Sequence, residues 1–230
     1  MKKLTTLILV ASVLPTGASA EALWMRDVKI SPDGTHIAFE YKGDIFTVPA
    51  TGGMATRLTT NPAYDSNPIW SPDGTRIAFA SARHGNFDVY VMPSGGGTAT
   101  RLTRNQAAEI PEAFSPDGRT VYFSAAIQNP AQSAMFPSSR MSEFYAVGVE
   151  GGKPRQVLGT PAQMPTFSAD GNVMLYQDVK GFEDEWRKHH TSSVTRDIWM
   201  VDFTTGKHTN LTDRPGAVSY THLRAHETEL

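Results

Sequence analysis

The side chains best suited to chemistry lie close together between residues 189 and 193. His189 and His190 could bind a metal, and Ser192 or Ser193 could act as a nucleophile with His190 as its base. Adjacent residues on an extended strand point to opposite faces, however, and no Asp, Glu or Cys stands at a recognised ligand spacing. The serines also lack a Gly-x-Ser-x-Gly elbow and an identifiable oxyanion donor. We therefore predict no metal, no cofactor and no catalytic residue in this chain.

An acidic and aromatic run precedes these residues. Glu183, Asp184, Glu185 and Trp186 belong to a long polar insertion of mixed charge, a composition typical of a solvated surface or of a face between domains. Long loops also commonly carry functional contacts. We therefore regard this run as a candidate contact for a substrate or for another domain.

Four repeats are the elements that must position these residues. The sequence Ser-Pro-Asp-Gly occurs at 31–34, 71–74 and 115–118, and Ser-Ala-Asp-Gly follows at 168–171, so the spacings are 40, 44 and 53 residues. Pro presets the second position of a turn, Asp suits the third, and Gly adopts the left-handed conformation that leads back into a strand. Each repeat is therefore predicted to contain a hairpin with this sequence at its tip.

Short segments rich in β-branched and aromatic residues surround each turn, and an acidic residue opens the third of them in every repeat. The fourth, outer strand is expected at 57–59, 101–103, 156–158 and 210–212. The predicted fold is all-β: a β-propeller of four-stranded antiparallel blades, with four blades present and the propeller incomplete. The blades are placed at about 24–60, 61–104, 105–159 and 160–213. The large apolar residues expected in the core between blades are Trp70, Phe79, Tyr90, Phe114, Phe123 and Trp199.

Three acids stand close to the start of a first strand. In a propeller the first strands surround the axis, so Asp27, Asp65 and Glu109 are predicted to line an axial channel and to contact substrate there.

The first twenty residues have the features of an export signal. Lys2 and Lys3 precede an apolar stretch that is too short to span a bilayer, and Ala18-Ser19-Ala20 forms a cleavage site, so the mature chain would begin at Glu21. The chain has no cysteine, so the exported protein must be stabilised by its core alone. Removal of Lys2 and Lys3 leaves 19 basic against 23 acidic residues, a formal net charge of −4, which argues against a nucleic-acid partner. We expect a periplasmic protein without a membrane span.

The repeats resemble those of TolB-type and tricorn-type propellers from about Trp24 to Pro215. Three segments narrow the resemblance to the N-terminal region of bacterial tricorn-like serine peptidases, which are relatives of the carboxyl-terminal-processing proteases. These segments are 42–49, 85–90 and, above all, 180–193.

The resemblance implies a function that the chain would perform for another part of the protein. In that family, propellers admit unfolded peptides, and a PDZ-like module and an α/β peptidase core further along carry the serine nucleophile and its histidine. The expected role is therefore noncatalytic gating and binding of unfolded peptides or proteins. A TolB-like protein-binding propeller and the propeller of a dipeptidyl-peptidase-like α/β-hydrolase are the alternatives.

The last residues depart from the repeat pattern. A reading frame of a transposon-based sequencing adapter encodes Val218 to Thr228 in order. We therefore expect residues 218–230 to be a non-native tail and the natural gene to continue into further blades and the peptidase part. A fragment of four blades would expose apolar blade faces and tend to aggregate.

Overall fold

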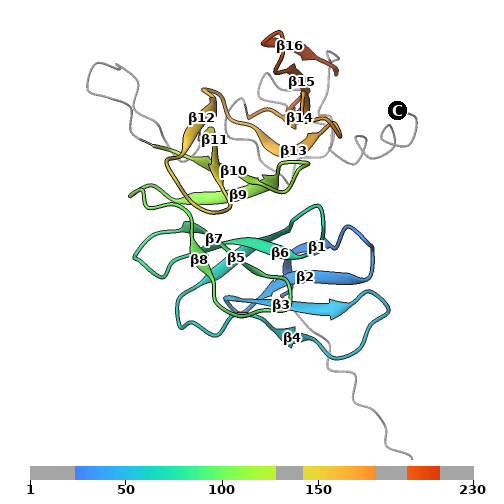
Figure 1. The fold of residues 1–230 in the computed structure, drawn as a ribbon, viewed down its shortest axis with the longest axis vertical. Coiled ribbons are helices and arrows are strands. Elements are labelled where there is room, and N and C mark those ends of the chain that lie inside the picture. The colour runs from blue at the N-terminus through green and yellow to red at the C-terminus, as the bar shows by residue number, and fades with distance from the viewer. Residues whose placement is uncertain (1–23, 128–141, 180–195, 213–230) are drawn as a thin grey trace, which may run out of the picture.

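The computed structural model describes residues 24–127, 142–179 and 196–212. Within them the chain forms four antiparallel sheets of four strands, each a meander in which consecutive strands pair. The sheets follow one another in space as they do in sequence (Figure 1), which confirms the predicted propeller blades. The strands are β1 Arg26–Ile30, β2 His36–Tyr41, β3 Asp44–Pro49, β4 Thr56–Arg57, β5 Asp65–Trp70, β6 Arg76–Ser81, β7 Asp88–Pro93, β8 Thr100–Arg101, β9 Glu109–Phe114, β10 Thr120–Ala125, β11 Glu143–Gly148, β12 Arg155–Leu158, β13 Gln163–Phe167, β14 Val173–Gln177, β15 Ile198–Asp202 and β16 Lys207–Asn210.

The predicted hairpin tips join the first two strands of every blade. In blade 1 the Gly34 amide donates to the Ser31 carbonyl at 2.9 Å, and Gly34 has a φ of 72°. The Ser31 hydroxyl donates to Asp33 Oδ1 at 2.5 Å and accepts from the His36 amide at 2.9 Å. The hydrogen bond from Ser31 is the main reason why the pKa of Asp33 falls to about 2. The Asp33 carboxylate therefore stays ionised far below neutral pH.

Successive turns also pack on each other along one end of the blades. A Cβ at Gly74 would lie 3.9 Å from the Pro32 ring, and a Cβ at Gly118 would lie 3.7 Å from the Pro72 ring. The proline of one turn thus covers the glycine of the next. We call this end the turn end and the opposite end, where β2 joins β3 and β6 joins β7, the loop end.

Gly118 provides a test of the turn. A side chain there meets only ordinary van der Waals contact, but the φ of 69° disfavours every residue except glycine. We expect Gly118→Ala to lower the free energy of unfolding by about 1–2 kcal/mol in urea titrations, because an L side chain is strained in this region. Gly95→Ala is the matched control, since Gly95 has open space around it and no positive φ. Equal effects of the two changes would contradict the assigned turn geometry.

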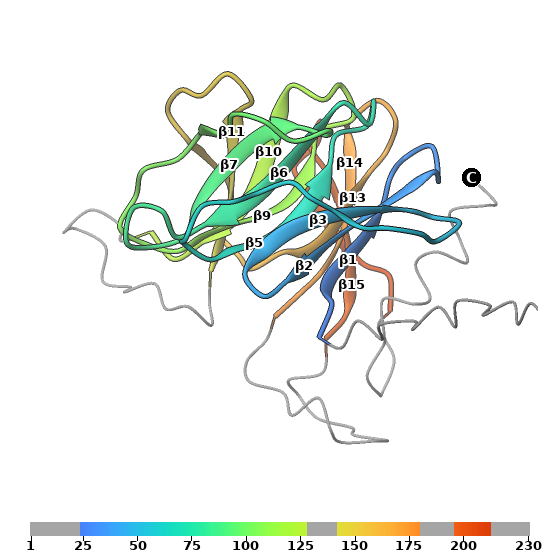
Figure 2. The ribbon, with the colours of Figure 1, turned by 90° about the horizontal axis from the view of Figure 1, so that it is seen from below.

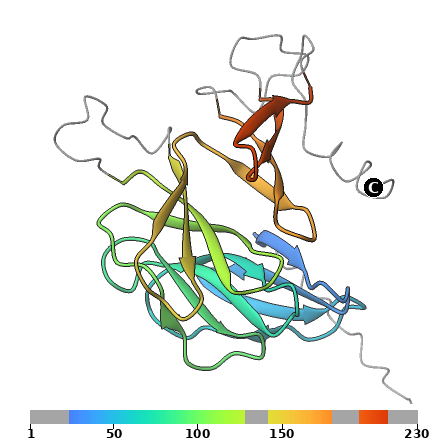
Figure 3. The same ribbon diagram turned by 45° about the horizontal axis from the view of Figure 1, so that its top comes forward.

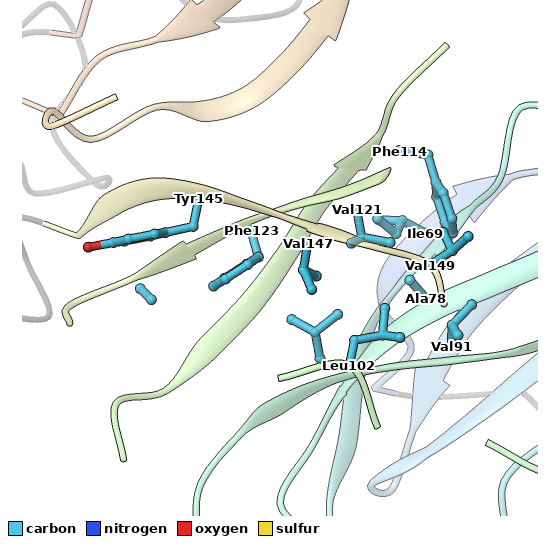
Figure 4. Close-up of a cluster of buried hydrophobic side chains, with 12 residues drawn as sticks. Ile69, Ala78, Val91, Leu102, Phe114, Val121, Phe123, Tyr145, Val147 and Val149 are labelled. Atoms are coloured by element: carbon cyan, nitrogen blue, oxygen red, sulfur yellow. The ribbon is translucent and has the colours of Figure 1, made fainter. Parts of the chain in front are cut away.

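Among the described residues, the core consists of three clusters, one at each junction between neighbouring blades. Alternate residues of a central strand face different neighbours: Val121 and Phe123 of β10 pack toward blade 2, whereas Tyr122 packs toward blade 4. Figure 4 shows the cluster between blades 2 and 3, where Phe123 and Val121 lie over Leu102. Both faces of a central strand are therefore buried. The predicted core positions are confirmed, with Trp70 and Trp199 partly buried at the edges of their clusters.

The outer strands differ from the prediction. In blades 1 and 2 they contain only two residues, and in blade 4 the strand Lys207–Asn210 lies earlier than expected. A side-chain bond explains the early end in blade 1: the Ile45 amide donates to the Thr59 hydroxyl at 2.9 Å instead of to a strand carbonyl. The same bond, also at 2.9 Å, joins Val89 to Thr103 and Ile198 to Thr212.

Candidate functional site

The candidate site lies at the loop end of the blades. The first strands begin there and the second strands end there, because each pair of strands is antiparallel. The first strands β1, β5, β9 and β13 contact one another in succession and form the inner side of the arc of blades (Figures 2 and 3). Residues 128–141, between β10 and β11, and residues 180–195, between β14 and β15, lie outside the described residues.

The three predicted channel acids occupy two kinds of position. Asp65 and Glu109 are the first residues of β5 and β9, and both side chains are 0% exposed. Asp27 is exposed on β1, and its Oδ2 accepts from the Asn67 amide at 3.4 Å. The structure therefore brings Asp65 and Glu109 to equivalent buried places and Asp27 to a different, accessible one. Their role in lining a channel stays a prediction.

A row of buried polar residues crosses blade 2 at this end. Asp65 pairs with Ser81, and Ser81 pairs with Asp88, along the ladder of β5, β6 and β7. All three side chains are fully buried. Arg83 Nη2 lies 2.9 Å from Asp65 Oδ2, and its guanidinium stacks 5.1 Å from the ring centroid of Tyr90. The arginine thus balances a buried carboxylate while resting on an aromatic ring.

The negative charge of Asp88 is balanced by Arg101 on the outer strand β8. Arg101 Nη2 lies 2.8 Å from Asp88 Oδ2, in an orientation outside hydrogen-bonding geometry, so this contact is a coulombic ion pair. The same arrangement occurs in blade 1, where Arg57 Nη2 lies 2.7 Å from Asp44 Oδ2. The acid that opens the third strand therefore ties the outer strand to the blade. Sequence reasoning noted the recurring acid but missed its partner, although Arg57 and Arg101 follow their acids at the same spacing.

Burial shifts the titration of two groups near this row. It raises the pKa of Tyr90, whose hydroxyl has no hydrogen-bond partner among the described residues. It also raises the pKa of Glu109, against the opposing effect of the Thr103 hydroxyl and the Asn105 amide. Glu109 Oε1 is likewise buried and without a partner in the described part of the chain. Because these atoms are inaccessible, we interpret the row as a structural base for the surface above it.

The pKa of Glu109 leads to a pH prediction. A carboxyl whose pKa is raised by folding contributes most to stability below its ordinary value of 4.5, and this contribution is lost as the pH rises through the folded value. We expect Glu109→Gln to raise the urea midpoint at pH 7 and to have little effect below about pH 4. Glu150→Gln, at a glutamate whose side chain is 84% exposed, is the control. A lower urea midpoint for Glu109→Gln at pH 7 would show instead that the ionised carboxylate stabilises the fold.

Glu112 is an inner acid that sequence reasoning missed. Its carboxylate accepts from the Ser124 hydroxyl at 2.7 Å, and burial raises its pKa, while the backbone amide of Met164 and the charge of Lys29 lower it. The Ser124 hydroxyl comes from β10 of the same blade and the Met164 amide from β13, so Glu112 joins the first strands of blades 3 and 4. The bulge in β9, between Pro111 and Ala113, turns it to this side, and no spacing in the sequence reveals such a bulge.

Two grooves open between blades at the loop end. The groove between blades 2 and 3 is lined by Leu102, Ile127 and Tyr145, with exposed Arg104 and Lys153 at its margin. Neither cation forms an ion pair within the described residues. An apolar floor with unpaired cations beside it can hold an extended peptide.

The groove between blades 3 and 4 is more aromatic. Tyr176 and Trp199 line it together with Pro161, Asp178 and His208. The Tyr176 hydroxyl lies 3.0 Å from His208 Nδ1, and Trp199 Nε1 donates to Asp178 Oδ2 at 3.1 Å. These bonds hold the polar groups of the groove in place.

Glu183, Asp184, Glu185 and Trp186, as well as the histidines and serines at 189–193 and the tail at 218–230, lie outside the described residues. Within the described ranges, no group of three His, Cys, Asp or Glu side chains is arranged to hold a metal ion. The same ranges contain no helix with the length and apolar character required to cross a membrane.

Meandering four-stranded sheets that stack face to face through three successive cores define a β-propeller protein. The family described as the tricorn protease N-terminal beta propeller domain matches residues 22–223. The chain belongs to this family.

Relatives of two kinds share part of the sequence. A TolB homologue of Chlorobium luteolum is 34% identical over 77 residues, which is 34% of this chain and 17% of that protein. Tricorn protease homologue 1 of Streptomyces coelicolor is 37% identical over 54 residues, which is 24% of this chain and 5% of that protein. The chain thus spans a small part of each relative.

Solved structures show the same fold. The tricorn protease aligns with 85% of this chain and 19% of its own, at a TM-score of 0.65 and 21% identity. A TolB-type structure from Agrobacterium tumefaciens aligns with 83% of this chain and 65% of its own, at a TM-score of 0.61 and 26% identity.

Proposed function

We propose that this propeller is the noncatalytic part of an exported tricorn-like serine peptidase and that it admits and holds unfolded peptides. The observation that carries the proposal is the family match over residues 22–223. In this proposal, hydrolysis is carried out by a PDZ-like module and an α/β peptidase core outside these 230 residues. Asp27 and the run from Glu183 to Trp186 are the proposed contacts to the channel or the substrate, and the buried Asp65 and Glu109 are proposed to support the channel wall from beneath.

The grooves support a peptide-binding role on physical grounds. An extended peptide offers apolar side chains to the floor formed by Leu102, Ile127 and Tyr145 and carboxylates to Arg104 and Lys153. A folded protein presents few such extended segments, so we expect the groove to bind unfolded chains in preference.

Binding of one protein in two states tests the proposal. We expect labelled, reduced α-lactalbumin, which is unfolded, to bind the full chain, and native α-lactalbumin to bind at least about tenfold more weakly. The double change Arg104→Glu with Lys153→Glu should weaken binding about tenfold, because it reverses both margin charges. Lys207→Glu, an exposed cation on β16 at the turn end, is the matched control. If the chain is well folded but does not bind reduced α-lactalbumin, the proposal is overturned.

A TolB-like protein-binding propeller is the second candidate. The 34% and 31% identities to two Chlorobium TolB homologues favour it. A propeller specific for a folded partner of its own should bind neither state of α-lactalbumin, so the same comparison separates the two functions.

Export is part of the proposal. It rests on Lys2 and Lys3, the apolar stretch after them and the Ala18-Ser19-Ala20 cleavage site. N-terminal sequencing of the protein recovered from a bacterial periplasm should begin at Glu21. Recovery of the protein in the cytoplasm with Met1 intact would contradict the proposed export.

A further inference from the structure

A cluster of aromatic and cationic side chains lies at the loop end where blades 1 and 2 meet. The Arg26 guanidinium lies 6.0 Å from the ring centroid of Trp24, and Lys42 Nζ lies 5.3 Å from that of Tyr41. Trp24 is 75% exposed and Tyr64 is 41% exposed, and both cations are exposed. We call Trp24, Arg26, Tyr41, Lys42 and Tyr64 the aromatic–cation patch.

Tyr64 joins the two halves of the patch. Its hydroxyl donates to the buried carboxylate of Glu40 and also interacts with the Arg26 side chain. Its ring lies against Gly43, where an added Cβ would come within 3.0 Å of it. The Gly43 carbonyl in turn accepts from the Asp65 amide at 2.8 Å. Strand β1, the β2–β3 turn and the start of β5 are thereby fixed relative to one another.

This fixed arrangement favours binding. The ring of Tyr64 also makes an edge contact with Phe87, at a centroid distance of 6.1 Å. A surface that is already ordered loses little conformational entropy when a partner binds, so its contacts are converted into affinity more efficiently. Exposed aromatic rings with neighbouring arginine are also the residue types that dominate binding energy at protein interfaces.

The charges of the patch indicate the partner. Arg26 and Lys42 form no ion pair within the part of the chain that the structure describes. Of the neighbouring carboxylates, Glu40 is only 4% exposed and is bound by Tyr64, and the exposed Asp27 accepts a hydrogen bond from the Asn67 amide. Both cations are therefore available to an incoming carboxylate, while the Trp24 ring offers an apolar face beside them.

We propose that the aromatic–cation patch binds an extended peptide in which acidic side chains flank an aromatic or aliphatic one. The inference rests on the proposed peptide-binding function and names the class of peptide selected. Single-stranded nucleic acid also combines negative charge with flat rings, but it needs a positive groove that follows the backbone. The patch has two cations, and the chain has a formal net charge of −2.

Fluorescence anisotropy with the full chain and three short labelled peptides tests the inference. One peptide alternates aspartate with phenylalanine, one lysine with phenylalanine, and one aspartate with serine. We expect the first to bind at least about tenfold more tightly than either other peptide, with an affinity that falls as salt is added.

Variants locate the binding. We expect the double change Arg26→Glu with Lys42→Glu to weaken binding of the aspartate–phenylalanine peptide about tenfold. The single change Trp24→Ala should weaken it by about the same factor. The controls at the turn end are Lys207→Glu and Met54→Ala, since Met54 is 90% exposed, and we expect them to stay within about twofold. Circular dichroism verifies that each variant is folded, and the charge reversals test the inference independently of the tryptophan.

The outcomes separate the inference from the proposed function. If reduced α-lactalbumin binds but the peptides do not differ, or the patch variants bind normally, the inference fails and the proposed function stands. If a folded chain binds neither the unfolded protein nor any peptide, the proposed function itself fails. Tighter binding of a single-stranded oligothymidine, lost in the same variants, would assign the patch to nucleic acid and overturn the inference.

Discussion

Phe123→Ala is expected to lower the free energy of unfolding by about 3–5 kcal/mol. Phe123 is 0% exposed in the core between blades 2 and 3, and its ring stacks on Tyr145 at a centroid distance of 5.6 Å (Figure 4). The change removes buried apolar surface and leaves a cavity that rigid strands on both sides cannot fill. Urea titration followed by tryptophan fluorescence measures the loss.

The same experiment shows whether the blades unfold together. Trp70 reports on the junction of blades 1 and 2, and Trp199 on that of blades 3 and 4. In a stack of repeats, weakening a central junction uncouples the units on either side. Single-tryptophan versions should therefore give separate transitions once Phe123 is replaced. Met54→Ala, at a 90% exposed residue, should change stability by less than about 0.5 kcal/mol. A similarly small effect at Phe123 would contradict a continuous core between the blades.

Arg101→Met is expected to cost about 3 kcal/mol, because it leaves a buried carboxylate without its counter-charge. The Asp88 side chain is 0% exposed, and Arg101 lies 2.8 Å away with 21% of its side chain exposed. Methionine retains the length of the arginine stem, so the change tests charge more than packing. Urea titration at neutral pH is the measurement.

A surface ion pair provides the comparison for Arg101. Arg76 and Glu150 are 3.2 Å apart, but their side chains are 42% and 84% exposed, so Arg76→Met should cost less than about 1 kcal/mol. Combining Arg101→Met with Asp88→Asn should recover much of the loss, because no uncompensated charge is then left buried. An equal cost for Arg101→Met with and without Asp88→Asn would show that the ion pair is not the source of the stability.

Local features of the fold were predictable because they depend on neighbouring residues. The turn at 31–34 follows from the restricted φ of proline, the short side chain of Asp33 and the left-handed conformation of Gly34. The core positions followed from the repeat, since Phe79 and Phe123 occupy the same place in the second strands of successive blades. The end of the outer strand was not predictable in this way, because it depends on a side-chain bond from Thr59 to a strand 14 residues away.

The candidate site was only partly predictable. Asp65 and Glu109 were recognised as acids at strand starts, but their complete burial depends on the neighbouring blade. Glu112 was missed because a bulge, and not the alternation of the strand, sets its direction. Glu109 and Glu112, which lie three residues apart on β9, thus have different partners: the Asn105 amide lies beside Glu109, and the Ser124 hydroxyl donates to Glu112.

The sequence alone determined the repeat, the turn of each hairpin and the all-β class, because these depend on short-range geometry and on the period of apolar residues. The tertiary structure decided which charges are buried, which arginine balances each acid and which aromatic rings stay exposed. Trp24 and Lys42 both belong to blade 1, and Tyr64 joins them only through the packing of blade 2 on blade 1. Such surfaces arise from contacts between blades, and the spacing of residues along a single chain does not encode them in a readable form.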